Sequence, residues 1–412
     1  MTLTADSILP IAAPSRVARP RRMIQLDVLR GIAILMVLGA HAVVPSSTAG
    51  LFFFPARLAE HLGWTGVDLF FVLSGFLVGG LLMEELRLRG SLDIGRFIIR
   101  RAFKIWPAYY CLVIGCFIFD GVQTGWGTSF HWYLPNLLHV QNYFGVGPLG
   151  VTWSLAVEEH FYLLLPLLLY LLTARGTRPG AIRALPWIAG GVIVGCNALR
   201  LYNLRYPYTD HRDYFPTHIR IDGLAMGVLL AYFYHFRPEF LARIGVRRWT
   251  LIVAALVLLS TMAKVDRMTS RFAWTIGYTL LYVGYACILT AFIHTPCGSA
   301  GGALGRFFSS RAARVLAGIG LYSYSIYLWH LTMVAHPFRH LIPWLNLRLP
   351  ATVYWLFWMS LYVGGAYVGG FILGRLIEMP ALVVRDRLFP PRAGAMRGGD
   401  VIPPTFEPIP RS

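Results

Sequence analysis

Charged side chains are scarce in this chain. They make up 14% of its 412 residues, against about a quarter in soluble globular proteins. Hydrophobic residues make up 56%, so the chain cannot cover itself with a soluble surface. The same composition excludes intrinsic disorder, a collagen-like rod and a small disulfide-stabilised secreted fold. The sequence therefore predicts an all-α integral membrane protein, because helices satisfy their own backbone hydrogen bonds inside a bilayer.

Lysines and paired cysteines are also scarce. Lys104 and Lys264 are the only lysines, so arginine carries almost all of the net charge of +18. The five cysteines form no CxxC pair, and they indicate neither a zinc site nor a disulfide framework. The arginines gather between apolar runs, as they do in the cytoplasmic loops of membrane proteins. We expect contact with the lipid bilayer and none with nucleic acid, in the cytoplasmic (inner) membrane of a bacterium.

Apolar runs of roughly 15 to 25 residues are long enough to cross a bilayer. The sequence predicts a polytopic bundle of ten such spans, at about 27–44, 66–83, 106–120, 154–173, 184–200, 218–236, 249–263, 272–293, 314–334 and 351–374. A further aromatic stretch, 131–144, contains Asn136, Gln141 and Asn142. We expect this stretch to lie at the membrane interface.

The distribution of arginine predicts the orientation of the bundle. Several segments between spans are basic, whereas 120–152 contains no lysine or arginine. Because basic loops stay in the cytoplasm, both termini are predicted to be cytoplasmic. We expect a basic N-terminal segment at 1–23, with an uncleaved first span after it, a transmembrane domain at 24–380 and a flexible basic tail at 381–412.

The first span contains three ionisable side chains, Asp27, Arg30 and His41. Such groups are costly inside a bilayer and usually functional. At 100° per residue they share one stripe of a helix, with His41 about 16 Å beyond Arg30. An interfacial Asp–Arg pair and a hydrogen-bonded core histidine would produce the same pattern, so a purely structural stripe is the alternative.

Polar residues interrupt the later spans as well. Asp68 and Ser74 lie in GVDLFFVLSGFL, where Ser74 is expected to serve close helix packing. The adjacent carboxylates Glu158 and Glu159 begin an apolar helix, and at least one of them must point into the bundle. Arg101 and Lys104 are cations suited to phosphates, and Tyr162 lies four residues after Glu158. Arg220 and Asp222 are expected near the outer face, where they could pair with each other or with loop charges. His330 lies in an aromatic belt.

Several familiar enzyme signatures are missing from the sequence. It contains no HExxH motif, P-loop, GxSxG elbow or dinucleotide-binding fingerprint. His336 and His340 are four residues apart in a predicted outer loop, but no third ligand lies near them in the sequence. We therefore expect no metal site.

One reaction fits a basic cluster at one end of the bundle and an imidazole further along. Arg30, Arg101 and Lys104 would bind the phosphates of an acyl-CoA. His41 would deprotonate an acceptor hydroxyl, since the pKa of a free imidazole lies near neutrality. A thioester is already activated, so no enzyme nucleophile is needed. Acyl-CoA, expected to be acetyl-CoA, would be a co-substrate, and no permanently bound cofactor is expected.

At these residues the chain resembles the membrane acyltransferase-3 family, which O-acylates sugars of surface polysaccharides, lipopolysaccharide, Nod factors and some macrolides. The resemblance covers about residues 24–380, so the transmembrane domain would be an acyltransferase domain. It is carried by LDVLRG with Arg30-x10-His41, GVDLFFVLSGFL, RRAFKIWPAY, WSLAVEEHFYLLLP, RIDGLAMGVLLA and YSIYLWH. The resemblance implies a ten-helix core and a catalytic role for His41. Glu158 and Glu159 are further candidates for catalytic residues.

The resemblance also implies that the basic pair before the third span forms the donor-side site. That pair is usually Arg-x-x-Arg, and here it is Arg101-Ala-Phe-Lys104. Lysine keeps the charge but loses the bidentate guanidinium fork. The predicted partners are acyl-CoA and a carbohydrate acceptor: a surface polysaccharide, a glycolipid or a glycosylated metabolite.

Three alternatives stay open at this point. The same charges could line the pathway of a transporter or flippase. A second type of polytopic acyltransferase uses an intramembrane histidine on another scaffold, but the position of His41 beside Arg30 disfavours it. The third alternative is a catalytically silent scaffold that binds polysaccharide-assembly proteins. It stays open because Lys104 departs from the arginine usual in the family.

Overall fold

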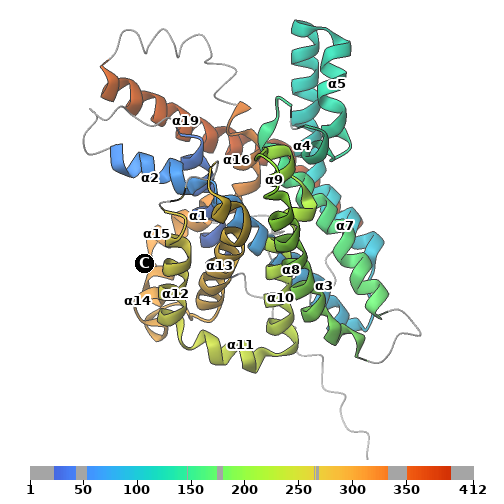
Figure 1. The fold of residues 1–412 in the computed structure, drawn as a ribbon, viewed down its shortest axis with the longest axis vertical. Coiled ribbons are helices and arrows are strands. Elements are labelled where there is room, and N and C mark those ends of the chain that lie inside the picture. Colours follow the sequence, from blue (N-terminus) through green and yellow to red (C-terminus); the bar gives the residue numbers. More distant parts are fainter. Residues whose placement is uncertain are drawn as a thin grey trace, which may run out of the picture.

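The computed structural model describes residues 23–42, 53–145, 147–173, 180–263, 265, 269–332 and 350–390. Within these residues every regular element is a helix and no strand occurs (Figure 1). The predicted all-α class is confirmed. In the described part of the chain, six helical segments are long and apolar enough to cross a membrane: Gly66–Arg89, Ile94–Thr124, Gly150–Thr173, Ala181–Asn203, Ala273–Ile293 and Thr352–Leu388.

The helices follow one another closely along the chain. The first half contains α1 (Ile24–Ala40), α2 (Phe53–Gly63), α3 (Gly66–Arg89), α4 (Ile94–Thr124), α5 (Trp126–Leu137), α6 (Gln141–Phe144), η2 (Gly150–Thr152), α7 (Trp153–Thr173), η3 (Ala181–Ala184) and α8 (Leu185–Asn203). The second half contains α9 (Asp210–Asp213), η4 (Thr217–Ile219), α10 (Asp222–Phe236), α11 (Pro238–Gly245), α12 (Arg248–Ser260), η5 (Ala273–Gly277), α13 (Tyr278–Ile293), η6 (Ser299–Gly301), α14 (Gly302–Phe308), α15 (Arg311–Leu321), α16 (Ser323–Trp329), α19 (Ala351–Leu373), η7 (Gly374–Glu378) and α20 (Met379–Leu388).

Some predicted spans correspond to shorter helices. The runs near 27–44, 218–236 and 249–263 contain α1, α10 and α12, which have 17, 15 and 13 residues. A transmembrane helix typically needs about 20 residues. The run 314–334 is divided between α15 and α16, and its last two residues lie outside the described part of the chain. The count of ten and the cytoplasmic placement of both termini stay predictions.

Helix α4 is much longer than the predicted span 106–120. It has 31 residues, contains the whole basic motif RRAFKIWPAY, and continues through Pro107. The side chain of Asp93 caps its first turn by accepting a hydrogen bond from the backbone N–H of Arg96 at 3.1 Å. The stretch 131–144 contributes to α5 and to α6, and α5 packs beside the end of α4 (Figure 1).

Glycines allow two pairs of helices to approach closely. A Cβ atom at Gly75 of α3 would lie 2.0 Å from the carbonyl oxygen of Leu224 in α10. A Cβ atom at Gly31 of α1 would lie 2.1 Å from the carbonyl oxygen of Leu316 in α15. Small residues at such crossings let backbones pack in contact. The close helix approach expected at Ser74 occurs at its neighbour Gly75, whereas the Ser74 hydroxyl forms a hydrogen bond with Tyr162.

The last described helix packs on the basic half of α4. Arg100 Nη1 lies 3.2 Å from Asp386 Oδ1. The carbonyl oxygens of Phe389 and Pro390 accept hydrogen bonds from Arg100 and Arg96. The predicted domain boundary at 380/381 thus falls inside α20, because these contacts continue the helical bundle to Leu388.

Candidate functional site

A cavity of about 140 Å³ lies where α1, α3, α4, α7 and the start of α16 meet, and we call it the Arg30 cavity. It brings together residues from four separate predicted spans. Cations and carboxylates share its lining, so its charge is largely balanced. The polar residues in the lining are Arg30, Ser74, Arg101, Lys104, Ser154, Glu158, Glu159, Tyr162, Ser323, Tyr324 and Tyr327.

The cations of the Arg30 cavity each have an anionic or aromatic neighbour. Arg30 Nη1 lies 3.4 Å from the buried carboxylate of Asp27, one helical turn away. The guanidinium of Arg101 lies over the ring of Tyr162, 5.8 Å from its centre. Lys104 forms an ion pair with the buried Glu378, which had not been identified from the sequence. Its only sequence signal is a lone carboxylate after the apolar run of α19.

The two carboxylates of α7 enter the same cavity. Tyr162 donates a hydrogen bond to Glu158 Oε2 at 2.6 Å, across one turn of the helix. Because this uses the single proton of Tyr162, the hydroxyl of Ser74 is the donor in its 2.9 Å contact with Tyr162. Glu159 Oε2 accepts a hydrogen bond from the indole of Trp106 at 3.3 Å. Both carboxylates thus have neutral donors in addition to the nearby cations.

A second cavity, of about 640 Å³, lies at the C-terminal end of α1, and we call it the His41 cavity. Its lining includes the side chains of His61, Trp64, Asp210 and Phe215. Val67 and Tyr327 line both cavities, so these two side chains form a shared wall. Arg30 and His41, placed on one stripe by the sequence, therefore open into different cavities.

His41 lies beside a second histidine. Its Nδ1 is 2.9 Å from the carbonyl oxygen of Val37. A carbonyl can only accept, so we assign the proton to Nδ1, which leaves the lone pair on Nε2. His330 is fully buried and contacts the carbonyl oxygen of Tyr327 in the same way, at 2.7 Å. The two ring centres are 5.0 Å apart, a proximity that sequence spacing could not reveal.

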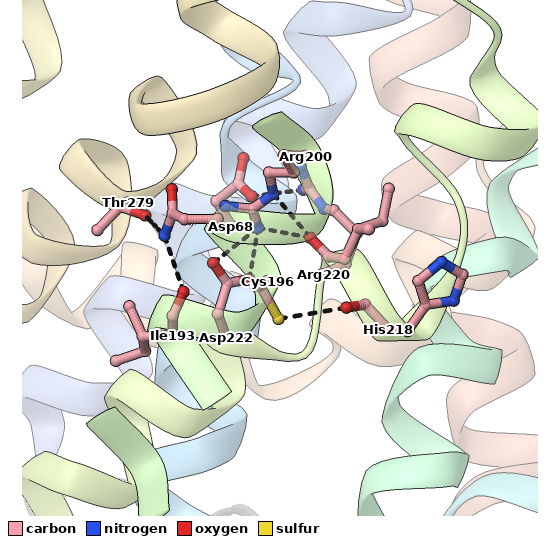
Figure 2. A network of polar contacts seen from close by, with 10 residues as sticks. Asp68, Ile193, Cys196, Arg200, His218, Arg220, Asp222 and Thr279 are labelled. Atoms are coloured by element: carbon pink, nitrogen blue, oxygen red, sulfur yellow. Dashed lines mark hydrogen bonds and ion pairs between the residues drawn. The ribbon is translucent and has the colours of Figure 1, made fainter. Parts of the chain in front are cut away.

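Asp68, Arg220 and Asp222 belong to a third group, a buried network shown in Figure 2. Arg220 Nη2 lies 2.5 Å from Asp68 Oδ1. Arg200 Nη2 donates to both oxygens of Asp222 at 2.6 Å. Arg220 and Asp222 do not pair with each other, and neither is exposed. The sequence left open a pair between these two residues or pairs with loop charges. The structure instead pairs Asp222 with Arg200 of α8 and Arg220 with Asp68 of α3.

His336 and His340 lie outside the described residues. Among the described residues, the aromatic lining of the His41 cavity was missed from the sequence. Trp64, Trp153 and the adjacent pair Tyr214 and Phe215 come from three separate places in the helical order. Their aromatic character alone gave no signal, because membrane proteins are rich in such residues.

Comparisons with known proteins agree with the sequence motifs. The sequence profile of the acyltransferase-3 family, described as an acyltransferase domain, matches residues 23–378. O-acetyltransferase OatA of Staphylococcus aureus (strain NCTC 8325 / PS 47) is 26% identical over 334 residues, which cover 76% of this chain and 51% of the relative. A putative O-acetyltransferase of S. aureus (strain MSSA476) is 26% identical over 360 residues, covering 82% and 54%.

The chain spans about half the length of the curated relatives that it matches. No solved structure matches it. The family profile covers most of the chain, and apolar helices long enough to span a membrane make up much of the matched region. The chain is an integral membrane protein and belongs to the membrane acyltransferase-3 family.

Proposed function

We propose that this protein is an O-acyltransferase that transfers an acetyl or other short acyl group from acyl-CoA to a carbohydrate hydroxyl. The observation that carries the proposal is the placement of two cavities along α1, one at Arg30 and one at the C-terminal end of the helix, with a shared wall of Val67 and Tyr327. One contains the cations Arg30, Arg101 and Lys104, and the other contains His41. The printed names of the relatives, which are O-acetyltransferases, favour acetyl as the group transferred.

The Arg30 cavity would hold the donor. Phosphates prefer arginine and lysine donors, and a partly desolvated cavity strengthens such contacts. From Arg30 to His41 is about 16 Å along the helix. An acyl-CoA is elongated, so its phosphates can stay near the cations while the narrow pantetheine arm passes the wall toward His41. The thioester would then lie beside the imidazole.

His41 would act as the general base. Its Nε2 takes the proton of the acceptor hydroxyl as the hydroxyl oxygen attacks the thioester carbon. The new C–O bond forms, the C–S bond breaks, and the proton passes to the departing CoA sulfur. Neither a covalent enzyme intermediate nor a metal is needed for this balance. Glu158 and Glu159, which line the Arg30 cavity, would act on the donor side and not on the acceptor hydroxyl.

A direct assay separates this proposal from its rivals. Purified protein is incubated with radiolabelled acetyl-CoA and a mixture of bacterial surface glycans, and the products are analysed by mass spectrometry. We expect free CoA and an O-acetylated glycan. A transporter, a flippase or a silent scaffold would leave the thioester intact, and that result would overturn the proposal.

A further inference from the structure

We infer that His330 is a positioning residue for His41, and that its Nε2 accepts a hydrogen bond when His41 carries a second proton. Because acyl transfer would place that proton on His41, this role of His330 rests on the proposed function. The proposed chemistry otherwise leaves His330, a fully buried and ionisable side chain, without a function. Two observations carry the role: the contact between the two rings and an unpartnered nitrogen of His330.

The ring of His330 is fixed in one orientation. Helix α16, which His330 directly follows, packs on both α1 and α19 (Figure 1). The Nδ1 atom of His330 lies 2.7 Å from the carbonyl oxygen of Tyr327. Since a carbonyl only accepts, we assign the proton of the neutral ring to Nδ1. The lone pair of the ring is therefore on Nε2.

That Nε2 atom is buried and has no hydrogen-bond partner. An unmatched buried acceptor costs free energy, and native structures contain few of them. The ring of His41 meets that of His330 edge-on, with 5.0 Å between the ring centres and 64° between the ring planes. While both rings are neutral, the Nε2 atom of His41 also carries a lone pair. The pair then has two acceptors on the Nε2 side and no donor for either.

Proton transfer from the acceptor hydroxyl changes one of these acceptors into a donor. His41 then carries an N–H on both nitrogens: Nδ1–H stays on the carbonyl oxygen of Val37, and Nε2–H is new. Rotation of the His41 side chain, the more exposed of the two, brings this N–H to the lone pair of His330. Hydrogen bonds from a charged donor are roughly twice as strong as neutral ones. His330 thus stabilises the imidazolium until the proton passes to the CoA sulfur as the C–S bond breaks.

His330 acts through His41 and not on the substrate. It is absent from the lining of the His41 cavity, whereas Tyr327 and Leu331, on either side of it in the chain, belong to the lining. A group behind the base can favour the protonated base without touching the reacting atoms. Such a group changes the rate of transfer and leaves the binding of acyl-CoA unchanged.

Other ionisable groups surround His41 at a greater remove from the inferred contact. The charged and imidazole side chains in the described lining are, besides His41, Arg57, Glu60, His61 and Asp210. Glu60 accepts a hydrogen bond from Arg57 at 3.0 Å, and Asp210 accepts one from Tyr208 at 2.6 Å. Substitutions at position 330 leave all of these groups in place. Their charges therefore contribute equally to the wild type and to the variants.

Two substitutions separate the acceptor from the structural hydrogen bond. An asparagine amide can reproduce Nδ1–H and its bond to Tyr327, whereas a glutamine carbonyl can reproduce the acceptor at Nε2. With purified full-length protein, acetyl-CoA and bacterial surface glycans, we expect His330→Asn to lower kcat by about 10- to 100-fold. His330→Gln should keep most of the wild-type kcat, and neither variant should change the KM for acetyl-CoA. The opposite order of the two variants would show a purely structural histidine and overturn the inference.

The matched control is Tyr362→Phe. Tyr362 is also buried, its hydroxyl also lacks a partner, and its ring centre lies 6.5 Å from that of His330. Loss of this hydroxyl should leave kcat within about twofold of the wild type, and melting temperatures verify that all three variants fold. A fall in kcat as large as that of His330→Asn would show that any polar change in this part of the bundle impairs transfer, which would also overturn the inference.

Nitrogen NMR tests the pair without acyl transfer. Histidine is labelled with 15N, the signals are assigned with His41→Ala and His330→Ala, and spectra are recorded from neutral to acidic pH in the absence of acetyl-CoA. We expect the Nε2 signal of His330 to shift as His41 is protonated, and this shift to vanish in His41→Ala. An unchanged signal would reject the pair. The expected shift in a protein that does not cleave acetyl-CoA would reject the acyltransferase proposal alone.

Discussion

Lys104 stands where the acyltransferase-3 family usually has arginine, and it forms an ion pair with Glu378. Glu378 is buried and Lys104 is half-buried, and the hydroxyl of Ser325 donates to the other oxygen of Glu378 at 2.7 Å. Lysine is a compact point charge that can serve one carboxylate and one phosphate in turn. We therefore expect Lys104 to contribute to donor binding despite the departure from the family pattern.

Lys104→Met should weaken the binding of CoA. Loss of one charge-assisted contact corresponds to a rise in Kd of about tenfold. Isothermal titration of the purified protein with CoA measures it. The matched control is Arg100→Met, because Arg100 pairs with Asp386 and does not line the Arg30 cavity. Equal weakening by both variants would mean that general positive charge, and not the cavity, binds CoA.

Single residues show what the sequence could and could not reveal about the site. Costly charges within apolar runs drew attention to Arg30 and Glu158, and the basic segment drew attention to Lys104. All three residues line one cavity. The same reasoning could not place His330 beside His41, because periodicity describes one helix and not which helices are neighbours. Glu378 was missed for the same reason.

At the scale of whole helices, glycine contacts determine how closely the elements that carry the site approach. Helix α3 carries Ser74 of the Arg30 cavity and Asp68 of the buried network, and it crosses α10 at Gly75 and Gly227. A Cβ at Gly227 would lie 2.2 Å from the carbonyl oxygen of Val72. The carbonyl oxygens of Leu224 and Val72, which face these two glycines, cannot move without shifting α10 and α3.

Gly75→Ala should therefore destabilise the bundle, by about 1–3 kcal/mol as in other overpacked interiors. The control is Gly115→Ala in α4, where an added Cβ meets no atom within 4 Å. That change should be neutral or stabilising by up to ~1 kcal/mol, since alanine is the better helix former. Thermal unfolding in detergent, followed by circular dichroism, measures both. Equal melting temperatures for the two variants would contradict this packing.

The lengths of the elements were predicted unevenly from the sequence. Apolar runs located the centres of α3, α7 and α13 well, because burial in lipid and burial in the bundle both select apolar residues. The start of α4 was misplaced, because its first turns are basic and were read as loop. These turns pack on α20 and on the two residues after it. Arg100 pairs with Asp386, and the carbonyls of Phe389 and Pro390 accept hydrogen bonds from Arg100 and Arg96.

At the scale of the whole molecule, the proposed function would make the Arg30 cavity a donor end and the His41 cavity an acceptor end. The basic turns of α4 lie at the donor end, which the positive-inside rule assigns to the cytoplasm. We expect inside-out membrane vesicles to use added acyl-CoA and sealed right-side-out vesicles not to use it. The release of CoA measures the rate. Equal rates in the two preparations would contradict the assignment of the ends.

The imidazole of His41 is the centre of the proposed chemistry, and one comparison tests it most directly. Wild type and His41→Ala are each saturated with labelled acetyl-CoA, and a single turnover of acyl transfer to a glycan acceptor is followed. We expect CoA to bind both proteins equally, because His41 is not part of the Arg30 cavity, and transfer by the variant to fall at least about 100-fold. Transfer at the wild-type rate by His41→Ala would show that this histidine is not the base.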